Sequence, residues 1–318
     1  MKITFIPERA KDEFKRWNQN IKDWCISRQL WWGHRIPIWY CKNNHITRSI
    51  DNLIICHCGE VVIQDSDCLD TWNSSWLWAT AIFDDNERDY YCPLDLIVTG
   101  IDILFFWIMK MIMASGYLYN KPPFKKVYFH GIVRDEFNKK MSKSLGNALN
   151  PIEIIDKIGV DPMRFSMLHS APKDGDMKIS MQSFEVGKTF CTKLWNIARY
   201  LYCNNIFDNV NYTIKNHECV DDELIINKLN VLIINIKQSF EKMDFQDICQ
   251  LLYNFVWNDF ANDYLEFCKN KLNDNKKNIL CFIFSNIIKL LHPIIPHITE
   301  EIWEIMKNND LYIQQYPE

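Results

Sequence analysis

The segment between residues 94 and 131 restricts the fold of this chain more strongly than its other segments. It reads "LDLIVT", then Gly100, then "IDILFFWIMKMIMASGY" and, after a short polar link, "KKVYFHG". The apolar runs and the glycine predict a strand over 94–99, a helix over 101–117 and a second strand over 125–131. A strand, a helix and a strand in this order form a βαβ unit, which implies a parallel sheet in an α/β domain.

The same apolar run is long enough to span a bilayer, but Asp95, Asp102 and Lys110 lie inside it. Charged residues favour buried elements of a water-soluble domain over a membrane helix. The first residues, "MKITFIPERAKDEF", contain no uninterrupted apolar stretch, so no signal peptide is predicted. Twelve cysteines in a chain with 48% hydrophobic residues do not require disulfides, because the core is large. We therefore expect a cytoplasmic, reduced protein without a membrane partner.

Composition along the 318 residues predicts two domains, with a boundary near residue 180. Residues 1–66 carry tryptophans, arginines and a Cys/His cluster, and residues 67–180 alternate short apolar runs with Gly and Pro. Residues 181–318 repeat apolar residues at helical spacing, as in the predicted helices 221–243, 244–267 and 278–293, and predict an all-α bundle. Asp244 and Thr299 are predicted to cap two of its helices, and the polar stretch 206–220 is predicted to connect into the later ones.

Polar residues follow both predicted strands, at the edge where nucleotide-type sheets bind ligands. Thr99, Gly100 and Asp102 follow the first strand, and His130 and Gly131 follow the second. The loop "KKMSKSLGN", residues 139–147, comes about ten residues later.

The lysine loop predicts contact with phosphates. Lys140 and Lys143 supply ammonium charge, and Ser142 and Ser144 supply hydroxyl donors, which suits phosphoryl or nucleotidyl transfer. Asp102 could accept hydrogen bonds from ribose hydroxyls. The alternative is a solvated, lysine-rich surface hairpin.

The motif "KMSKS" at 140–144 resembles the second signature loop of the class I aminoacyl-tRNA synthetases. Within that class, the chain is similar to the valyl type through four stretches. They are "WCISRQLWWGHRIPIWYC", "CLDTWNSSWLW", "VTGIDILFFW" and "GVDPMRFSMLHSAPKDGDMKIS". "HPIIPHITEEIW" resembles the anticodon-binding bundle of the family. The resemblance implies half of a Rossmann-type catalytic domain over 1–180, with a Cys/His insertion at about 40–66, and an anticodon-binding bundle over 181–318.

By this resemblance the chain is expected to act as a ligase that activates valine with ATP and Mg²⁺ and transfers it to tRNA-Val. The two loop lysines, with Ser142 and Ser144, would contact the ATP phosphates. Gly100 and Asp102 would hold the adenylate ribose, and His130 and Gly131 would lie beside the adenine.

Trp72, Ile103 and Trp107 match the walls of the family's amino-acid pocket. Such a pocket would exclude isoleucine by size but reject threonine weakly. Ordinary core packing is the alternative for both tryptophans. The isoleucyl type shares the fold and the lysine loop, but "DTW" and "FFW" favour valine.

The first signature of the class, His-Ile-Gly-His or a variant, is not found, and neither is the large editing domain. The chain is therefore expected to be the C-terminal half of a synthetase and to be inactive alone, needing a separate N-terminal half. A truncated sequence, a gene fragment and one half of a split enzyme all fit. The alternatives to an enzyme are a non-catalytic tRNA-binding module and an adenylate-binding structural subunit.

The stretches "CKNNH" and "CHCGE" bring Cys41, His45, Cys56 and Cys58 into one cluster, with His57 beside them. Four such ligands suit a closed, structural zinc site. The spacing departs from paired Cys-x₂-Cys, so the alternative is a ribbon that no longer binds metal.

The net charge of −4 excludes a protein that coats nucleic acid by bulk electrostatics. Contacts to tRNA are therefore expected from scattered residues such as Lys188, Lys193 and Arg199, whose alternative role is helix-surface solvation.

Overall fold

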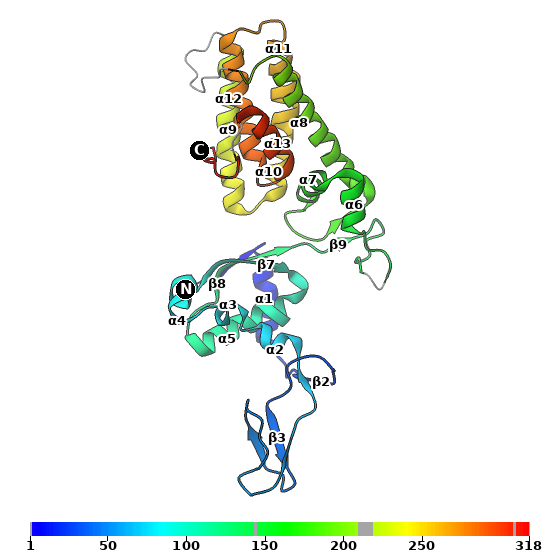
Figure 1. The fold of residues 1–318 in the computed structure, drawn as a ribbon, viewed down its shortest axis with the longest axis vertical. Helices are drawn as coiled ribbons and strands as arrows, with labels where there is room; N and C mark the ends of the chain where they lie inside the picture. Colours follow the sequence, from blue (N-terminus) through cyan, green and yellow to red (C-terminus); the bar gives the residue numbers. More distant parts are fainter. Residues whose placement is uncertain (1, 143–144, 209–218, 308–309, 318) are drawn as a thin grey trace. The chain divides into compact units, whose positions relative to one another are not determined.

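The computed structural model describes residues 2–142, 145–208, 219–307 and 310–317 (Figure 1). They form two compact units, Met1–His130 and Gly131–Glu318. The elements of the first unit are β1 (Thr4–Ile6), α1 (Ala10–Gln19), β2 (Ser27–Arg28), β3 (Ile38–Cys41), β4 (Ile46–Arg48), β5 (Val62–Gln64), β6 (Cys68–Leu69), α2 (Thr71–Ser75), α3 (Trp78–Ala81), α4 (Asp85–Tyr91), β7 (Leu94–Gly100), the 3₁₀ turn η1 (Ile101–Ile103), the π-helix η2 (Leu104–Met109), α5 (Lys110–Tyr119) and β8 (Phe124–His130).

The second unit consists of helices and one short strand pair. Its elements are β9 (Val133–Arg134), α6 (Pro151–Ile158), α7 (Val160–Ser170), β10 (Met177–Lys178), the 3₁₀ turn η3 (Met181–Phe184), α8 (Glu185–Cys203), α9 (Val220–Lys242), α10 (Phe245–Asn254), the π-helix η4 (Phe255–Leu265), α11 (Glu266–Cys268), α12 (Asp274–Leu291) and α13 (Pro296–Lys307).

The predicted βαβ unit is present. Strands β7 and β8 pair in parallel, with Ile97 opposite Val127 and Gly100 opposite His130. The three-residue strand β1 joins the other side of β8 and gives the order β1-β8-β7. We did not predict β1, because three residues are too few for a periodic signal. The pairing brings the carboxyl ends of β7 and β8 to the same edge.

The helix between these strands has three geometries in succession. It starts as η1, widens into η2 and continues as α5. Leu104, Ile108 and Met111 are buried against the sheet, in a core that includes Val127 and Phe124. By length and composition alone the stretch Ile101–Tyr119 could cross a membrane, a test that the core helix of a water-soluble protein also passes. Contacts with the sheet account for its buried apolar residues, such as Leu104, Ile108 and Met111.

A small antiparallel ribbon, β4-β3-β5, lies within residues 38–64. Its interior contains Trp39, Cys41, Cys56 and Val62, with Leu53 packed against them. An apolar cluster of this size cannot fix a ribbon by burial alone. Other interactions must therefore help to hold it.

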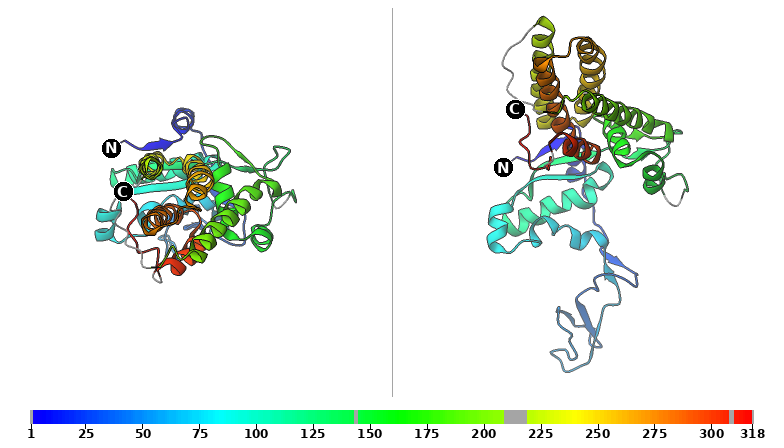
Figure 2. Two further views of the ribbon diagram at one scale, coloured as in Figure 1. Left: turned by 90° about the horizontal axis from the view of Figure 1, so that it is seen from above. Right: turned by 45° about the horizontal axis from the view of Figure 1, so that its top comes forward.

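The second unit has a large helical core, and Figure 2 shows its long helices packed side by side. Fully buried residues from five of these elements meet there: Leu194, Leu229, Leu252, Phe260 and Phe284. The predicted helices are confirmed as α9, the continuous run from α10 to α11, and α12. The connection predicted over 206–220 lies between α8 and α9, and residues 209–218 are outside the described ranges.

One of the two predicted helix caps is right. The Asp244 carboxylate accepts a hydrogen bond from the Asp247 backbone N–H at 3.2 Å, which caps α10. Thr299 is not a cap, since α13 begins at Pro296. A proline suits the first helical position because its φ is already fixed. The buried Thr299 hydroxyl instead donates to the Ile295 carbonyl at 2.8 Å, as threonines inside helices do.

The compact units divide between His130 and Gly131. Residues 131–180 belong to the second unit because α7 packs closely against α8. The domain boundary near residue 180 stays a prediction. A Cβ at Gly187 of α8 would lie 2.1 Å from the Pro162 carbonyl oxygen, and the Gly187 N–H donates to the Ser166 hydroxyl at 3.0 Å. Only a residue without a side chain permits this approach.

We expect Gly187→Ala to destabilise the second unit by about 2–3 kcal/mol, because the added methyl would force α7 and α8 apart. Helix propensity alone would favour alanine by roughly 1 kcal/mol. Amide hydrogen exchange of α7 and α8 measures the change. Gly116→Ala in α5, where a Cβ would meet nothing within 4 Å, is the control and should stabilise its helix slightly. Unchanged protection of α7 and α8 in Gly187→Ala would contradict the packing argument.

Candidate functional site

Three of the predicted site residues meet at the carboxyl edge of the sheet. Gly100 ends β7 and lies opposite His130, the last residue of β8. A Cβ at Gly100 would lie 2.6 Å from Asp102 Oδ1 and 3.6 Å from His130 Cε1. The Asp102 and His130 side chains are exposed. This edge therefore presents a carboxylate, an imidazole and uncovered backbone, a combination suited to hydroxyl groups and an aromatic ring.

Gly131 is the first residue of the second unit, and its environment excludes a side chain. A Cβ there would lie 2.1 Å from the Gly175 carbonyl oxygen. The neighbouring Ile132 N–H donates to Asp176 at 3.1 Å, and Arg134 pairs with the same carboxylate. These contacts fix the backbone that leads into the lysine loop.

The lysine loop belongs to the second unit. Lys140 is exposed and forms a backbone bridge with Arg134. Ser142 is half-buried, and its hydroxyl accepts a hydrogen bond from the Leu145 N–H at 3.3 Å. Lys143 and Ser144 lie outside the described residues.

Asp135 and Asn147, which sequence reasoning missed, brace the two ends of this loop. The Asn147 amide donates to Asp135 at 2.9 Å and to the Lys140 carbonyl at 3.3 Å, and it accepts from the Ser142 N–H at 3.0 Å. The hydrogen bond from Asn147, and then that from the Lys139 backbone, holds the pKa of the Asp135 carboxyl below its usual range. The sequence signal for this brace was an Asp and an Asn on either side of the lysine loop, since both side chains readily bond to nearby backbone groups.

Trp72 and Trp107, predicted to line an amino-acid pocket, stand on the neighbouring elements α2 and η2. The Trp107 indole N–H donates to the Ser75 carbonyl at 3.2 Å, and the Trp72 ring stacks on Phe106 at 5.7 Å. Both indoles and the Ile103 side chain are half-buried. They are thus neither fully packed core nor free surface.

Asp70, Trp24 and Phe106 were also missed. Asp70 is 6% exposed, accepts from the Trp24 indole N–H at 3.0 Å and lies 3.5 Å from the Arg28 guanidinium. Trp24 contacts Phe106 edge-on at 5.1 Å. Burial lowers the pKa of Lys110, whose ammonium lies 5.6 Å from the Trp24 ring. A buried, charge-bearing position next to two indoles is typical of a ligand pocket, and "LDTW" was its signal.

The predicted Cys/His cluster is brought together at one end of the ribbon. The ligand atoms of Cys41, His45, Cys56 and Cys58 all lie within 4.8 Å of one another. The Cys41 and Cys58 sulfurs are 3.8 Å apart. Two sulfurs held ~2.3 Å from a tetrahedral zinc would be about 3.8 Å apart.

Local backbone geometry produces this cluster. The Cys41 N–H donates to the His45 carbonyl at 3.2 Å, and Asn44 closes that turn with φ 59°. The Gly59 N–H donates to the Cys56 carbonyl at 2.9 Å. A hydrogen bond from the Glu60 backbone, with a further one from His45, lowers the pKa of the Cys58 thiol to about 6. A thiolate at neutral pH is the form that binds metal.

His57 is a fifth donor beside these four. Its Nδ1 lies 3.4 Å from the Cys56 sulfur, and its ring is 4.4 Å from that of His45. The sequence "CHCGE" thus places the Cys56 sulfur and the His57 ring next to each other at the cluster.

The helical unit has a cavity of about 460 Å³ between α8 and α13, lined by Trp195, Ala198, Arg199, Tyr202 and Ile305. Trp195, Arg199 and Tyr202 are exposed, so two aromatic rings and a cation face solvent here. Sequence reasoning named Arg199 but missed both rings. Their spacing along one helix face was the signal.

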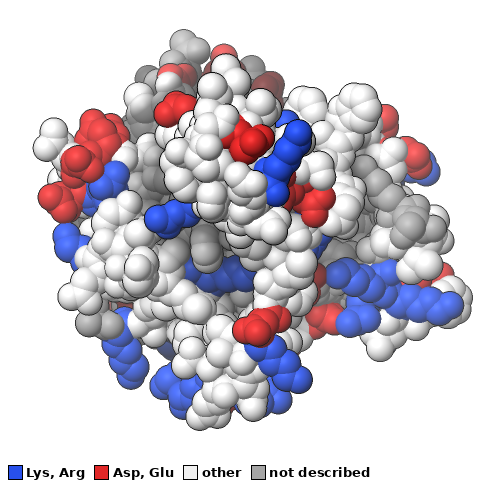
Figure 3. Space-filling model, turned by 90° about the horizontal axis from the view of Figure 1, so that it is seen from below, with Lys and Arg blue, Asp and Glu red and all other residues white. Residues whose placement is uncertain are grey.

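The other two predicted cations do not line this cavity. Lys188 is exposed. Lys193 is half-buried, and its ammonium lies 5.0 Å over the Trp257 ring and 3.3 Å from the Asn262 side-chain oxygen. On the face drawn in Figure 3, Lys and Arg form separate groups with Asp and Glu among them, and much of the surface is uncharged.

Two family models match the chain. Residues 1–57 and 42–180 match "tRNA synthetases class I (I, L, M and V)", and residues 222–318 match "Anticodon-binding domain of tRNA ligase". The valine--tRNA ligases of Petrotoga mobilis and Thermotoga maritima are 40% and 39% identical over 99% of this chain. The chain spans 38% of the length of each of these curated relatives.

Solved structures share the fold. The Agrobacterium radiobacter K84 agnB2 LeuRS–tRNA–LeuAMS complex matches 96% of this chain and 44% of its own, with a TM-score of 0.79 and 18% identity. Mycobacterium tuberculosis methionyl-tRNA synthetase with methionyl-adenylate matches 97% of this chain and 60% of its own, with a TM-score of 0.74 and 18% identity.

Proposed function

Because the chain belongs to the class I tRNA synthetases, we propose that it forms part of a valine–tRNA ligase and supplies one side of its adenylate site. The observation that carries the proposal is the meeting of Gly100, Asp102 and His130 at the sheet edge. Relatives named valine--tRNA ligase, about 40% identical, favour valine over the isoleucyl alternative. A non-catalytic tRNA-binding module would need none of these three residues.

The proposed chemistry is adenylate formation. The valine carboxylate attacks the α-phosphate of ATP, which enters with Mg²⁺, and pyrophosphate leaves. Asp102 accepts hydrogen bonds from ribose hydroxyls, and His130 lies beside the adenine. By the family pattern, Lys140 and Lys143 of the second unit would supply ammonium charge to the phosphate that reacts. The Asp135–Asn147 brace sets the loop in advance, so that less ordering is needed when ATP binds.

The proposed amino-acid pocket is formed by Trp72, Ile103 and Trp107. Two half-buried indoles and a branched chain offer apolar walls suited to valine. The Trp24–Asp70 hydrogen bond orients the Trp24 indole, which contacts Phe106 next to Trp72. Discrimination against a larger side chain by one methylene is worth about 1–3 kcal/mol in such a pocket.

We expect Lys140→Ala to slow valine-dependent ATP–pyrophosphate exchange about a hundredfold, or roughly 3 kcal/mol, with the KM for valine unchanged. The assay mixture also contains, as a separate polypeptide, the part of a curated relative that this chain does not span. Lys139→Ala, an exposed neighbour in the same loop, is the matched control and should retain exchange. Equal exchange rates for the two variants would favour the alternative of a solvated surface hairpin and overturn the proposed role of Lys140.

We also propose that the α8–α13 cavity receives an unstacked base of tRNA-Val. Bases of a single-stranded loop stack on aromatic rings and on Arg guanidinium groups. Trp195 and Tyr202 supply rings at this cavity, and Arg199 supplies a guanidinium.

Trp195→Ala should weaken binding of tRNA-Val by the full chain by about 1–3 kcal/mol, since one stacking platform is lost. Fluorescence anisotropy at two salt concentrations measures it. Tyr312→Ala, which removes another exposed ring of the same unit outside this cavity, should change little. Equal losses for the two variants, with a steep salt dependence, would indicate non-specific binding instead.

We propose that Cys41, His45, Cys56 and Cys58 hold a structural zinc ion. Their donor set and spacing fit a tetrahedral site without an open position. The ribbon around them has only a small apolar core, so a metal would supply much of its stability.

Purified protein should contain close to one zinc per chain by elemental analysis. Zinc should be retained at pH 7.5 and released on acidification, because protons compete with the metal for its ligands. The lowered pKa of the Cys58 thiol favours retention, whereas the raised pKa of the Cys56 thiol opposes it. A chelator should remove hydrogen-exchange protection from β3 and β5 but leave β7 and β8 unchanged. Metal-free protein with a fully protected ribbon would contradict the site.

A further inference from the structure

A buried polar cluster in the second unit contains a cysteine and a lysine in contact. The Lys276 Nζ lies 3.1 Å from the Cys219 sulfur and pairs with Asp222, which also accepts from the Tyr264 hydroxyl at 2.7 Å. Lys276 is 4% exposed and Asp222 is fully buried, while Cys219 is half-buried. Neither tRNA binding nor valine activation uses these groups.

The cluster joins the starts of two long helices. Cys219 is the residue before α9, and Lys276 is in the first turn of α12. Their contact fixes an amine against a thiol without any rearrangement, which gives the pair a high effective concentration. Cys268, the other thiol near Tyr264, is fully buried, and this burial raises its pKa to about 11, so it is a poor competitor.

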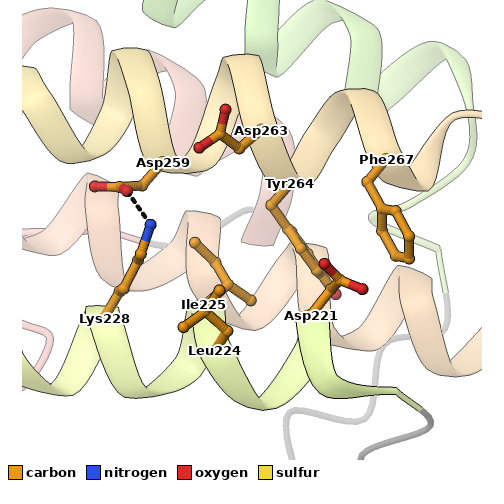
Figure 4. Close-up of a pocket in the computed structure, with 8 residues that line it drawn as sticks. All are labelled: Asp221, Leu224, Ile225, Lys228, Asp259, Asp263, Tyr264 and Phe267. Atoms are coloured by element: carbon orange, nitrogen blue, oxygen red, sulfur yellow. Dashed lines mark hydrogen bonds and ion pairs between the residues drawn. The ribbon is translucent and has the colours of Figure 1, made fainter.

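Solvent reaches the edge of this cluster. A cavity of about 280 Å³ opens between α9 and η4 and is lined by Asp221, Tyr264 and Phe267 (Figure 4). The Tyr264 hydroxyl contacts Asp222, and the Phe267 ring lies 5.2 Å from the Lys276 ammonium. Because Cys219 is itself half-buried, a small oxidant can reach its sulfur from solvent.

We propose that Cys219 and Lys276 form an oxidant-sensitive modification site, in which a peroxide converts the contact into a covalent sulfur–nitrogen bond. The Cys219 thiol takes one oxygen from hydrogen peroxide, giving a sulfenic acid and water. The Lys276 nitrogen then attacks the Cys219 sulfur, an S–N bond forms, the S–O bond breaks and a second water leaves.

Asp222 accepts the proton that the second step releases. Burial lowers the pKa of Lys276, but the hydrogen bond with Asp222 raises it overall, so the proton moves to the carboxylate only as the nitrogen attacks the sulfur. The product is a sulfenamide and a neutral Asp222 acid, so the positive and the negative charge disappear together. No unpaired ion remains in the buried cluster, where it would be costly. A reducing thiol cleaves the S–N bond and restores both groups.

The test treats the full chain with hydrogen peroxide and maps its tryptic peptides by mass spectrometry. We expect a crosslink between the peptides of Cys219 and Lys276 that is two hydrogens lighter than their sum, lost on adding dithiothreitol. Cleavage after Lys276 should be blocked in the crosslinked form. The exposed Cys203 of the same unit is the internal reference and should form no lysine crosslink.

Lys276→Arg keeps a cation beside Asp222 but should abolish the crosslink and leave Cys219 as a sulfenic acid that dimedone traps. Cys219→Ser should abolish both products. Circular dichroism checks that each variant is folded. The proposal is overturned if wild-type Cys219 is labelled by dimedone as fully as in Lys276→Arg, or if Cys219 crosslinks to another residue.

Discussion

The parallel pairing of β7 with β8 is the constraint on which the candidate site depends. Parallel strands present their carboxyl ends together, so Gly100 and His130 become neighbours although thirty positions separate them along the chain. The helix between them is buried on the sheet side, and its first residues carry Asp102 to the same edge. If the register slipped by one residue, the apolar and polar faces of β8 would exchange and this edge would lose its arrangement.

The second unit is stabilised mainly by burial of large apolar residues in its helical core, which leaves little room for polar groups. Two of its buried polar groups, Asp222 and Ser166, are paired. Asp222 has both Lys276 and Tyr264, and Ser166 bonds to Gly187 and to the Phe184 carbonyl. Such pairs contribute less to stability than to specificity, since each polar group fits one arrangement of the helices. The same contact that satisfies Lys276 also places it against a thiol.

Much of the fold could be predicted because its signals are local. The period of apolar residues gave α9, α12 and the strands β7 and β8, and the Asp244 cap followed from its side chain. Strand β1 and the start of α13 could not be predicted, because a three-residue strand depends on its partner and Pro296 competed with Thr299 for the helix start. The meeting of Gly100, Asp102 and His130 at one edge could be predicted because parallel strand order implies a shared edge. Asp70, Asp135 and Asn147 were missed, since their roles rest on contacts with residues distant in the sequence.

The π-helix η2 has a consequence for how this chain can vary. A π-turn contains one residue more than an α-turn. The number of residues in η2 therefore sets how the segment after it is rotated relative to the segment before it. Removing one residue from η2 would restore α-helical winding and rotate one flank against the other by about 100°. Either the Trp107 indole would leave the Ser75 carbonyl or the buried face of α5 would turn from the sheet. A substitution in this helix changes the contacts of one position, whereas a change in its length displaces every contact on one side of η2.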